Sequence, residues 1–200
     1  ASFRLGNGNN IFNWNKKANP FSDVLVYGGN GTDIFNIKAG SSGFLEIGAG
    51  DGNNTFNLTG GKEFQNLRLY GGSDQDLFNI SGDFSPNNYN STRFYGNGGD
   101  DTIDISNTTG LTASKTSTYI RGGSGNDYII GSSEGNRLIG GSDNDLLKGG
   151  GGNDVLHGHM EYGNNKYDNA DIAIYSGKSS DYRVSRATDA SFGYAYYICL

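Results

Sequence analysis

Short segments that alternate apolar and polar residues occur along most of the chain, and each follows a glycine-rich turn. In these segments apolar side chains recur at every second position after the Asp or Asn that ends the turn, at Phe12, Phe35, Phe56, Phe78, Ile103 and Ile129 and then at Trp14, Ile37, Leu58, Ile80 and Ile105. A period of two is typical of a β-strand with one buried face. A second apolar strand precedes most of the turns, at Val24–Tyr27, Phe44–Ile47, Leu67–Tyr70, Thr92–Tyr95, Thr118–Arg121 and Arg137–Ile139. Each unit is therefore predicted to run strand, loop, strand and glycine turn.

The turns recur at a nearly regular interval. Their terminal Asp or Asn lies at positions 10, 33, 54, 76, 101 and 127, so the steps are 23, 21, 22, 25 and 26 residues, and a step of 9 then gives Asn136, Asp145 and Asp154. Such units bury their apolar faces by stacking on their neighbours. We therefore predict an all-β fold, a right-handed parallel β-roll or β-solenoid over residues 1–158, whose coils of 21–26 residues shorten to 18. Residues 159–200 are expected to form a C-terminal β cap that leads into a further domain.

The outward positions of these strands form two candidate surfaces. Asn13, Asn36, Asn57, Asn79 and Asp104 fall in register and predict a ladder of stacked amides. Tyr27, Tyr70 and Tyr95 fall in register in the preceding strands, beside Arg121. Aromatic neighbours on adjacent strands commonly stabilise a sheet, and a strip that binds sugar or a protein partner is the alternative interpretation.

Composition excludes several classes of protein. The 200 residues include 34 Gly and only 2 Pro, and 34% are hydrophobic, which excludes collagen and disfavours one wide core. No apolar run is long enough to span a membrane, and the net charge of −6 disfavours a nucleic-acid partner. Cys199 is the only cysteine, so disulfides do not hold the chain together. Stacking or bound metal must do so instead.

The turns themselves suggest which metal. Calcium takes six to eight oxygen ligands, which include Asp carboxylates and backbone carbonyls, and two stacked glycine turns ending in Asp offer both. Glycine is needed where the backbone adopts a positive φ and approaches the ion. Without the ion the carboxylates repel one another, so folding is expected to depend on calcium.

The turns also resemble a known family, the RTX repeats (Gly-Gly-x-Gly-x-Asp-x-apolar-x) of secreted bacterial proteins, which form calcium-loaded parallel β-rolls. Gly28–Asp33, Gly122–Asp127 and Gly149–Asp154 fit the six-residue turn, whereas Gly71–Asp76 and Gly140–Asp145 have Asp at its fourth position. The turns between Gly122 and Gly158 follow one another at nonapeptide spacing. The segment 170–184 is similar to the one that often closes such rolls.

The resemblance implies several calcium ions and names their ligands. The best-matched site combines Gly123, Gly125 and Asp127 with Gly140, Ser142 and Asp145 of the next coil. Asp154 pairs with Asn136 at the other edge, and Asp33, Asp76 and Asp101 are expected to continue the ladder of sites. At Asn10 and Asn54 the carboxylate is missing. There we favour an amide that hydrogen-bonds its neighbour with no ion, and an ion site is the alternative.

The resemblance further implies a calcium-binding structural module of a secreted or cell-surface bacterial protein, of the S-layer or adhesin type, that folds on calcium binding after type I secretion. Neighbouring domains or protomers of a surface assembly are the expected partners, and Phe3–Gly6, the second strand of an incomplete coil, is expected to be covered by one of them. The module itself is expected not to be an enzyme.

Two other functions remain open. A polysaccharide lyase or epimerase is one, with Arg68, Arg93 and Arg121 near Glu46 as its thin support. The other is a module that binds polysaccharide or ice through the Asn ladder or the tyrosines. His157 and His159, with Glu161 nearby, could suggest a transition-metal site, but they lie where the repeat breaks down and are interpreted as a terminal turn.

Overall fold

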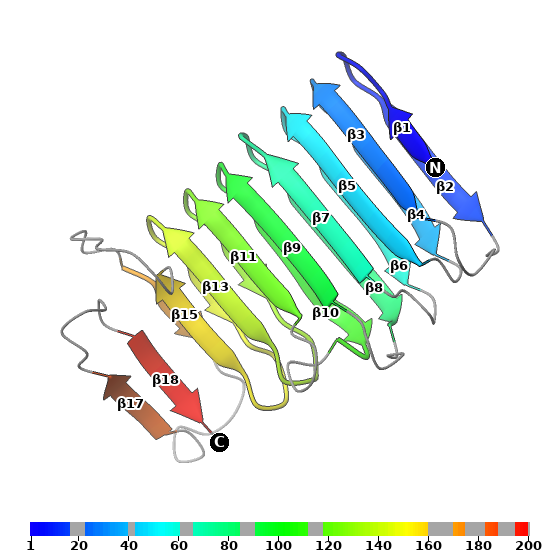
Figure 1. The fold of residues 1–200 in the computed structure, drawn as a ribbon. Coiled ribbons are helices and arrows are strands. Elements are labelled where there is room, and N and C mark those ends of the chain that lie inside the picture. Colours follow the sequence, from blue (N-terminus) through cyan, green and yellow to red (C-terminus); the bar gives the residue numbers. More distant parts are fainter. Residues whose placement is uncertain are drawn as a thin grey trace.

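The chain folds into two facing parallel β-sheets that follow one long axis (Figure 1). The computed structural model describes residues 1–16, 23–39, 43–60, 66–84, 91–111, 118–159, 170–174, 183–187 and 195–199. These residues form strands and turns and contain no helix. Consequently, none of them belongs to a helix of the length and apolar character needed to cross a membrane.

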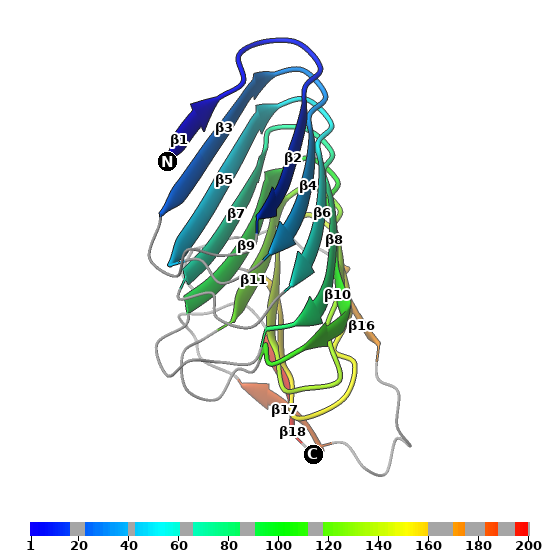
Figure 2. The same ribbon diagram turned by 90° about the vertical axis from the view of Figure 1, so that its right-hand side faces the viewer.

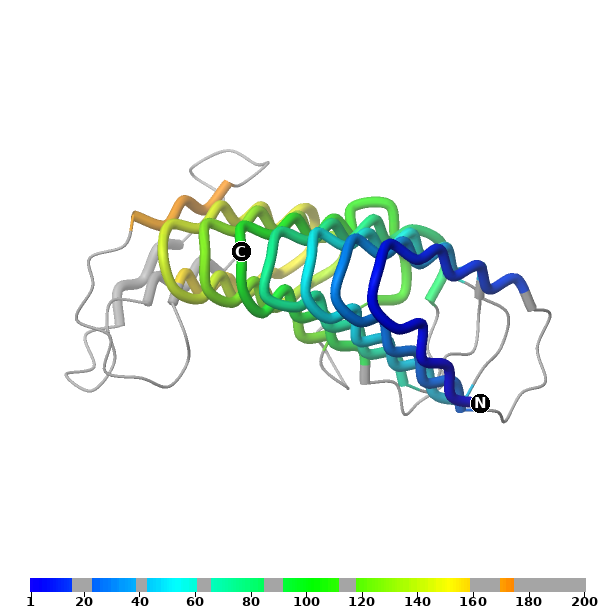
Figure 3. Tube along the Cα trace, turned by 90° about the horizontal axis from the view of Figure 1, so that it is seen from above, coloured from blue at the N-terminus to red at the C-terminus, as the bar shows by residue number. Residues whose placement is uncertain are grey.

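The strands alternate between the two sheets along the chain. Sheet A contains, in spatial order, β1 (Ser2–Arg4), β3 (Val24–Asn30), β5 (Phe44–Asp51), β7 (Asn66–Gly72), β9 (Ser91–Gly98), β11 (Tyr119–Ser124), β13 (Arg137–Ser142) and β15 (Val155–His159). Sheet B contains β2 (Ile11–Lys16), β4 (Ile34–Ala39), β6 (Thr55–Gly60), β8 (Leu77–Asp83), β10 (Thr102–Thr109), β12 (Tyr128–Ile130), β14 (Leu146–Lys148) and β16 (Ile172–Ile174). Successive coils lie side by side along the axis (Figure 3). The predicted all-β parallel solenoid is therefore confirmed.

The glycine turns lead from sheet A to sheet B and lie together at one edge (Figure 2). We call them the A-to-B turns. Between hydrogen-bonded neighbours the chain advances by 23, 21, 22, 25, 26 and then 18 residues, which are the steps that the sequence predicts.

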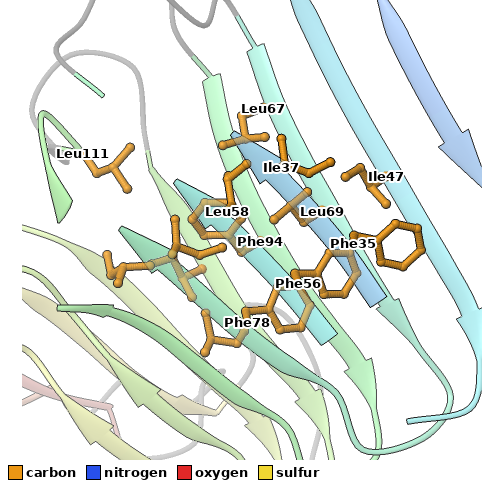
Figure 4. Packing of buried hydrophobic residues seen from close by; sticks show 14 of the residues in the cluster. Phe35, Ile37, Ile47, Phe56, Leu58, Leu67, Leu69, Phe78, Phe94 and Leu111 are labelled. Atoms are coloured by element: carbon orange, nitrogen blue, oxygen red, sulfur yellow. The ribbon is translucent and has the colours of Figure 1, made fainter. Parts of the chain in front are cut away.

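A thin apolar core fills the space between the sheets, and it consists of the side chains that the alternation predicts to point inward. Phe35, Phe56 and Phe78 stack on one another, with ring centroids 5.1 Å and 4.4 Å apart (Figure 4). Leu67, Leu69 and Phe94 from sheet A, like these three rings, are at most 1% exposed. Phe12 and Trp14, expected in the core, are only partly buried because they belong to the first coil, which has a neighbour on one side.

The outward ladder forms over four rungs. The amide of Asn36 donates to Asn13 (2.8 Å), that of Asn57 to Asn36 (2.9 Å) and that of Asn79 to Asn57 (3.0 Å). Asp104, the expected fifth rung, instead accepts a hydrogen bond from the backbone N–H of Ser106, because a carboxylate has no N–H to continue the series.

Tyr27, Tyr70 and Tyr95 fall in register beside Arg121 as predicted, but Tyr27 does not join the stack of rings. Tyr70 and Tyr95 stack with parallel rings 5.1 Å apart, and Tyr95 contacts Tyr119 at 5.7 Å. Gly48 lies between Tyr27 and Tyr70 in register, so Tyr27 is separate from this stack, and the guanidinium of Arg4 lies over its ring.

The last described strands are of two kinds: one extends the solenoid, and two form a separate pair. β16 pairs with β14 in sheet B, although its residues fall within the predicted cap. β17 (Arg183–Ala187) and β18 (Ala195–Cys199) form a separate antiparallel pair, and β18 contacts β15. Glu161 and residues 175–182 lie outside the described residues, and the division of the chain at residue 158 stays a prediction.

Candidate metal centre

The terminal residues of the A-to-B turns form a continuous column, the edge ladder, whose members are Asn10, Asp33, Asn54, Asp76, Asp101, Asp127, Asp145 and Asp171. In each step the backbone N–H of one member donates to the Oδ1 atom of the next, at 2.7–3.0 Å. These bonds lock the coils in vertical register. The sequence-predicted site residues of this edge are therefore brought together.

The second carboxylate oxygen has no such partner in the five acidic members from Asp33 to Asp145. Oδ2 is buried without a hydrogen bond in Asp33, Asp76, Asp101, Asp127 and Asp145. The same residues are only 0–2% exposed. A buried carboxylate oxygen without a donor is costly, because it has lost its hydration and gained nothing in return. A row of such atoms is what a bound cation would neutralise.

Burial and repulsion by neighbouring acids also oppose ionisation of four of these carboxyls in the absence of a cation, those of Asp76, Asp101, Asp127 and Asp145. Burial is the main cause that raises the pKa of Asp76 and Asp127 to about 7. Burial, with the neighbouring acids second to it, raises the pKa of Asp101 and Asp145 to about 8. A divalent cation would reverse this balance, because it favours the ionised form of every carboxylate around it.

Glycine is required in the best-matched site for two different reasons. Gly123 and Gly125 have φ values of +140° and +116°, which side-chain-bearing residues rarely adopt. At Gly140 the space is the limit, because a Cβ atom there would lie 2.1 Å from Oδ2 of Asp145. Ser142 is the partner of Ser124 in the pairing of β13 with β11, so this turn stacks directly on the previous one.

This set of ligands fits calcium. In the described part of the chain no three His, Cys, Asp or Glu side chains form a cluster, so an ion here would need backbone oxygens as well as carboxylates. The carbonyls of one turn face the next: a Cβ added at Gly141 would lie 2.0 Å from the carbonyl oxygen of Gly123. Carboxylate and carbonyl oxygens without nitrogen or sulfur are the ligands of a hard cation such as calcium.

The turns that end in Asn are arranged differently. The side-chain amide of Asn54 donates to the carbonyls of Gly50 (3.2 Å) and Gly52 (2.6 Å) within its own turn. The amide of Asn10 makes the equivalent bonds to Gly6 (3.1 Å) and Gly8 (2.8 Å). These two turns therefore satisfy their own carbonyls with hydrogen bonds.

Among the residues that the structure describes, the opposite edge repeats this contact once. The backbone N–H of Asn136 donates to Oδ1 of Asp154 at 2.8 Å, so these two predicted residues also meet. Burial raises the pKa of Asp154 to about 6. Oδ1 of Asn136 accepts from the backbone of Ser132, and its amide donates to the carbonyl of Leu111. The side chain of Asn136 is thus committed to other partners.

Asp171 is a member of the edge ladder that the sequence analysis missed. It lies 26 residues after Asp145, beyond the last nonapeptide turn, and Oδ1 accepts from the Asp145 backbone at 3.0 Å. A Cβ at Gly158 would lie 2.1 Å from its Oδ2 atom, which places Gly158 where Gly140 stands in the preceding coil. The available signal was an Asp followed by the alternating strand Ile172–Ile174.

The histidine expected in a terminal turn lies instead within a strand. His157 belongs to β15 and is 9% exposed. Burial, with the charge of Arg137 second to it, lowers its pKa.

Comparison with known proteins identifies repeats in the part of the chain where successive members of the edge ladder are acids. Residues 93–104, 117–133 and 130–160 match the family model of the RTX calcium-binding nonapeptide repeat, in four copies. Asp101, Asp127, Asn136, Asp145 and Asp154 lie in the matched segments, and Asp33 and Asp76 lie outside them. No curated protein and no solved structure shows significant similarity to the chain.

Proposed function

From the RTX calcium-binding nonapeptide repeats that this chain carries between residues 93 and 160, we propose that it is a calcium-binding structural module of a secreted or cell-surface protein. One observation carries the proposal: five buried Oδ2 atoms without a donor lie in register along one edge. Calcium ions between successive turns would offset the cost of their lost hydration and, from Asp76 onward, the repulsion between neighbouring acids.

The ligands are assigned by turn. Gly123, Gly125 and Asp127 form one half of the main site, and Gly140, Ser142 and Asp145 of the following coil form the other. Asp76 and Asp101 continue the ladder toward the N-terminus, supported by Oδ2 atoms in the same state as that of Asp127. Asp33 is a separate site between two Asn turns. Asp154 with Asn136 is a weaker site, because Asn brings no charge and its side chain already bonds Ser132 and Leu111.

The proposed biology follows from the calcium requirement. Extracellular modules bind calcium with dissociation constants on the order of 10⁻⁴–10⁻³ M, so the ladder fills outside the cell and remains empty in the cytosol. The chain is then exported unfolded and folds where calcium is present. An S-layer or adhesin role, reached by type I secretion and involving neighbouring domains or protomers, is the function we propose for the parent protein.

Circular dichroism tests the proposal. In calcium the chain gives a strand spectrum with a cooperative thermal transition, and in chelator much of that signal and stability is lost, because the acid-bearing coils no longer have their ions. Isothermal titration of the calcium-free chain measures the number of ions bound. Identical spectra and thermal midpoints with and without calcium would contradict the proposal.

A second candidate function, binding of an anionic polysaccharide, is supported by the outer face of sheet A. Arg68, Arg93 and Arg137 share one column of that face, and Tyr70 and Tyr95 share the next. Glu46 forms an ion pair with Arg68 (3.7 Å) and is the acid of this arginine column. Arginine binds carboxylates through paired hydrogen bonds, and this face is positive on a chain of net charge −6.

Affinity electrophoresis in a uronate polymer separates the alternatives for this face. Arg93→Ala should release the chain from the polymer, whereas Lys38→Ala on sheet B should not. Formation of unsaturated sugar product in the same mixture would indicate a lyase, and equal migration of all variants would contradict binding.

A further inference from the structure

We propose that two residues of each A-to-B turn between Asn10 and Asp145 decide whether the turn binds calcium: its terminal residue and the residue five positions earlier. Asp with glycine at the earlier position gives a calcium turn. Asn with a larger residue there gives a turn closed by its own amide, in which the NH₂ group replaces the ion. The turns that end at Asn10 and Asn54 are of this second kind. The inference deepens the proposed function and rests on it.

The hydrogen bonds of the Asn turns provide the first argument. In both turns the amide nitrogen donates to the carbonyls four and two residues earlier, at 3.1 and 2.8 Å for Asn10 and at 3.2 and 2.6 Å for Asn54. An amide has two N–H donors and one carbonyl acceptor. In Asn54 both donors are used inside the turn and Oδ1 accepts the ladder bond from Asp33, so the whole side chain is satisfied without an ion. The amide nitrogen of Asn10 also donates to Oδ1 of Asp33 in the next turn, at 2.8 Å.

An Asp side chain cannot close its turn with hydrogen bonds in this way, although it makes the same ladder bond. Oδ1 of Asp76 accepts from Asn54 at 2.7 Å, just as Oδ1 of Asn54 accepts from Asp33 at 2.9 Å. Asp and Asn differ only at the second terminal atom, where an ionised carboxylate has an acceptor and no donor. Oδ2 of Asp76 is buried without a partner. The same place in the turn therefore holds a donor in one case and calls for a cation in the other.

The identity of the residue five positions earlier correlates with that of the terminal residue. It is glycine before every acidic turn from Asp33 to Asp145, and a Cβ at these glycines would lie 2.0–2.3 Å from Oδ2, at Gly28, Gly71, Gly96, Gly122 and Gly140. Real Cβ atoms do not approach other atoms within 3.0 Å. Before the Asn turns the residue is Leu5 or Ala49. The carboxylate position is therefore available only where glycine leaves it open.

Two substitutions together should convert an amide turn into a calcium turn. Ala49→Gly with Asn54→Asp provides both the carboxylate and its space, and native mass spectrometry in calcium is expected to count at least one more bound ion per chain than in the wild type. Asn54→Asp alone is expected to bind no additional ion, because the Cβ of Ala49 blocks the carboxylate. Asn57→Asp adds the same charge to the same coil on its outer face and serves as the matched control, with no gain.

The reverse exchange gives an independent test that does not depend on folding of the first variant. Gly71→Ala with Asp76→Asn should lose at least one ion. Asp76→Asn alone should lose it too, and this single variant avoids the 2.6 Å approach of a Cβ at Gly71 to the carbonyl oxygen of Gly96. A wild type that binds calcium while both double variants keep its ion count would overturn this inference alone. A wild type that binds no calcium would overturn the proposed function and this inference with it.

Discussion

The amino-terminal and carboxy-terminal coils have the same arrangement of strands but different side chains in their cores. Between β3 and β8 the core contains the stack of Phe35, Phe56 and Phe78, in coils that advance by 21–25 residues. Between β12 and β15 the inward residues are aliphatic, among them Ile129 and Leu147, and the coil shortens to 18 residues. Because a Phe side chain buries more apolar surface, each amino-terminal coil gains more from its core.

The edge ladder also differs between the two regions, and here the carboxy-terminal region has more acids. The amino-terminal edge ladder has two amide-closed turns around Asp33, whereas from Asp76 onward five members in succession are acids, ending with Asp171. The large core and the amides belong to one region, and four of the five carboxylates with an unpartnered Oδ2 belong to the other, Asp33 being the exception. We infer from this difference that aromatic stacking stabilises the amino-terminal coils and that the calcium proposed above stabilises the carboxy-terminal ones.

Removal of calcium should separate the two regions, and this is the largest effect that we expect. In chelator the backbone amides of β11–β15 lose their protection against hydrogen exchange, because their carboxylates no longer have ions. Those of β4, β6 and β8 remain protected. Exchange followed by mass spectrometry on peptides from each region measures this. Uniform loss along the whole solenoid would show that the regions do not differ.

Truncation of the aromatic core should act on the amino-terminal region whether or not calcium is present. Phe56 is 1% exposed and lies between two other rings, so Phe56→Ala is expected to cost about 3–5 kcal/mol. Denaturant unfolding in calcium, with exchange of β4–β8 in chelator, measures both cases. If the loss of stability in Phe56→Ala disappeared in calcium or in chelator, the aromatic core would not stabilise this region independently of the metal.

A methyl group in the carboxy-terminal edge should weaken calcium binding. A Cβ at Gly122 would lie 2.0 Å from Oδ2 of Asp127, so Gly122→Ala displaces a proposed ligand. Loss of support for a metal ligand typically costs roughly 10–100-fold in affinity. Gly48→Ala is the control, because its Cβ would meet only the Tyr27 ring at an ordinary 3.8 Å. Calcium titration of both variants measures the effect, and equal affinities would argue against the assignment.

The stability of the carboxy-terminal region should depend on pH with opposite sign in the two calcium states. Because burial raises the pKa of Asp101 and Asp145 from 3.8 to about 8, the calcium-free folded chain binds more protons than the unfolded one between about pH 4 and pH 8. Its stability therefore falls as pH rises through that range. Calcium requires the ionised form, so its affinity rises over the same range.

Thermal unfolding of decalcified protein, followed near pH 5 and near pH 8 in metal-free buffer and again in excess calcium, measures this dependence. The midpoint should be higher at the lower pH without calcium, and calcium should raise it most at the higher pH. A calcium-free midpoint that rises with pH would contradict the raised pKa values.

The smallest expected effect concerns the outer Asn ladder of the amino-terminal coils. Asn57→Ala removes the bonds of 2.9 and 3.0 Å to Asn36 and Asn79, at a cost of about 1 kcal/mol because these groups are only partly buried. The loss should be the same in calcium and in chelator, as measured by denaturant unfolding. A strong calcium dependence would link this ladder to the metal edge.

Most of the fold could be predicted from the sequence because period-two alternation and recurring turns determine which faces are buried. The inward positions, the coil lengths and the meeting of Asp127 with Asp145 all follow from those two patterns. The state of Oδ2 could not be predicted, since it depends on a hydrogen bond between coils that uses only Oδ1. Asp171 was missed because the regular spacing ends before it, and pairing with β14 brings it back into line.

A crystal structure of the calcium-loaded chain, with an anomalous difference map for calcium, tests the central claim most directly. We predict peaks between successive turns along the column from Asp76 to Asp145, in contact with carboxylate and glycine carbonyl oxygens, and no peak in the turns that end at Asn10 and Asn54. A map without peaks among the acidic turns, or with peaks of equal height in the Asn turns, would contradict the account.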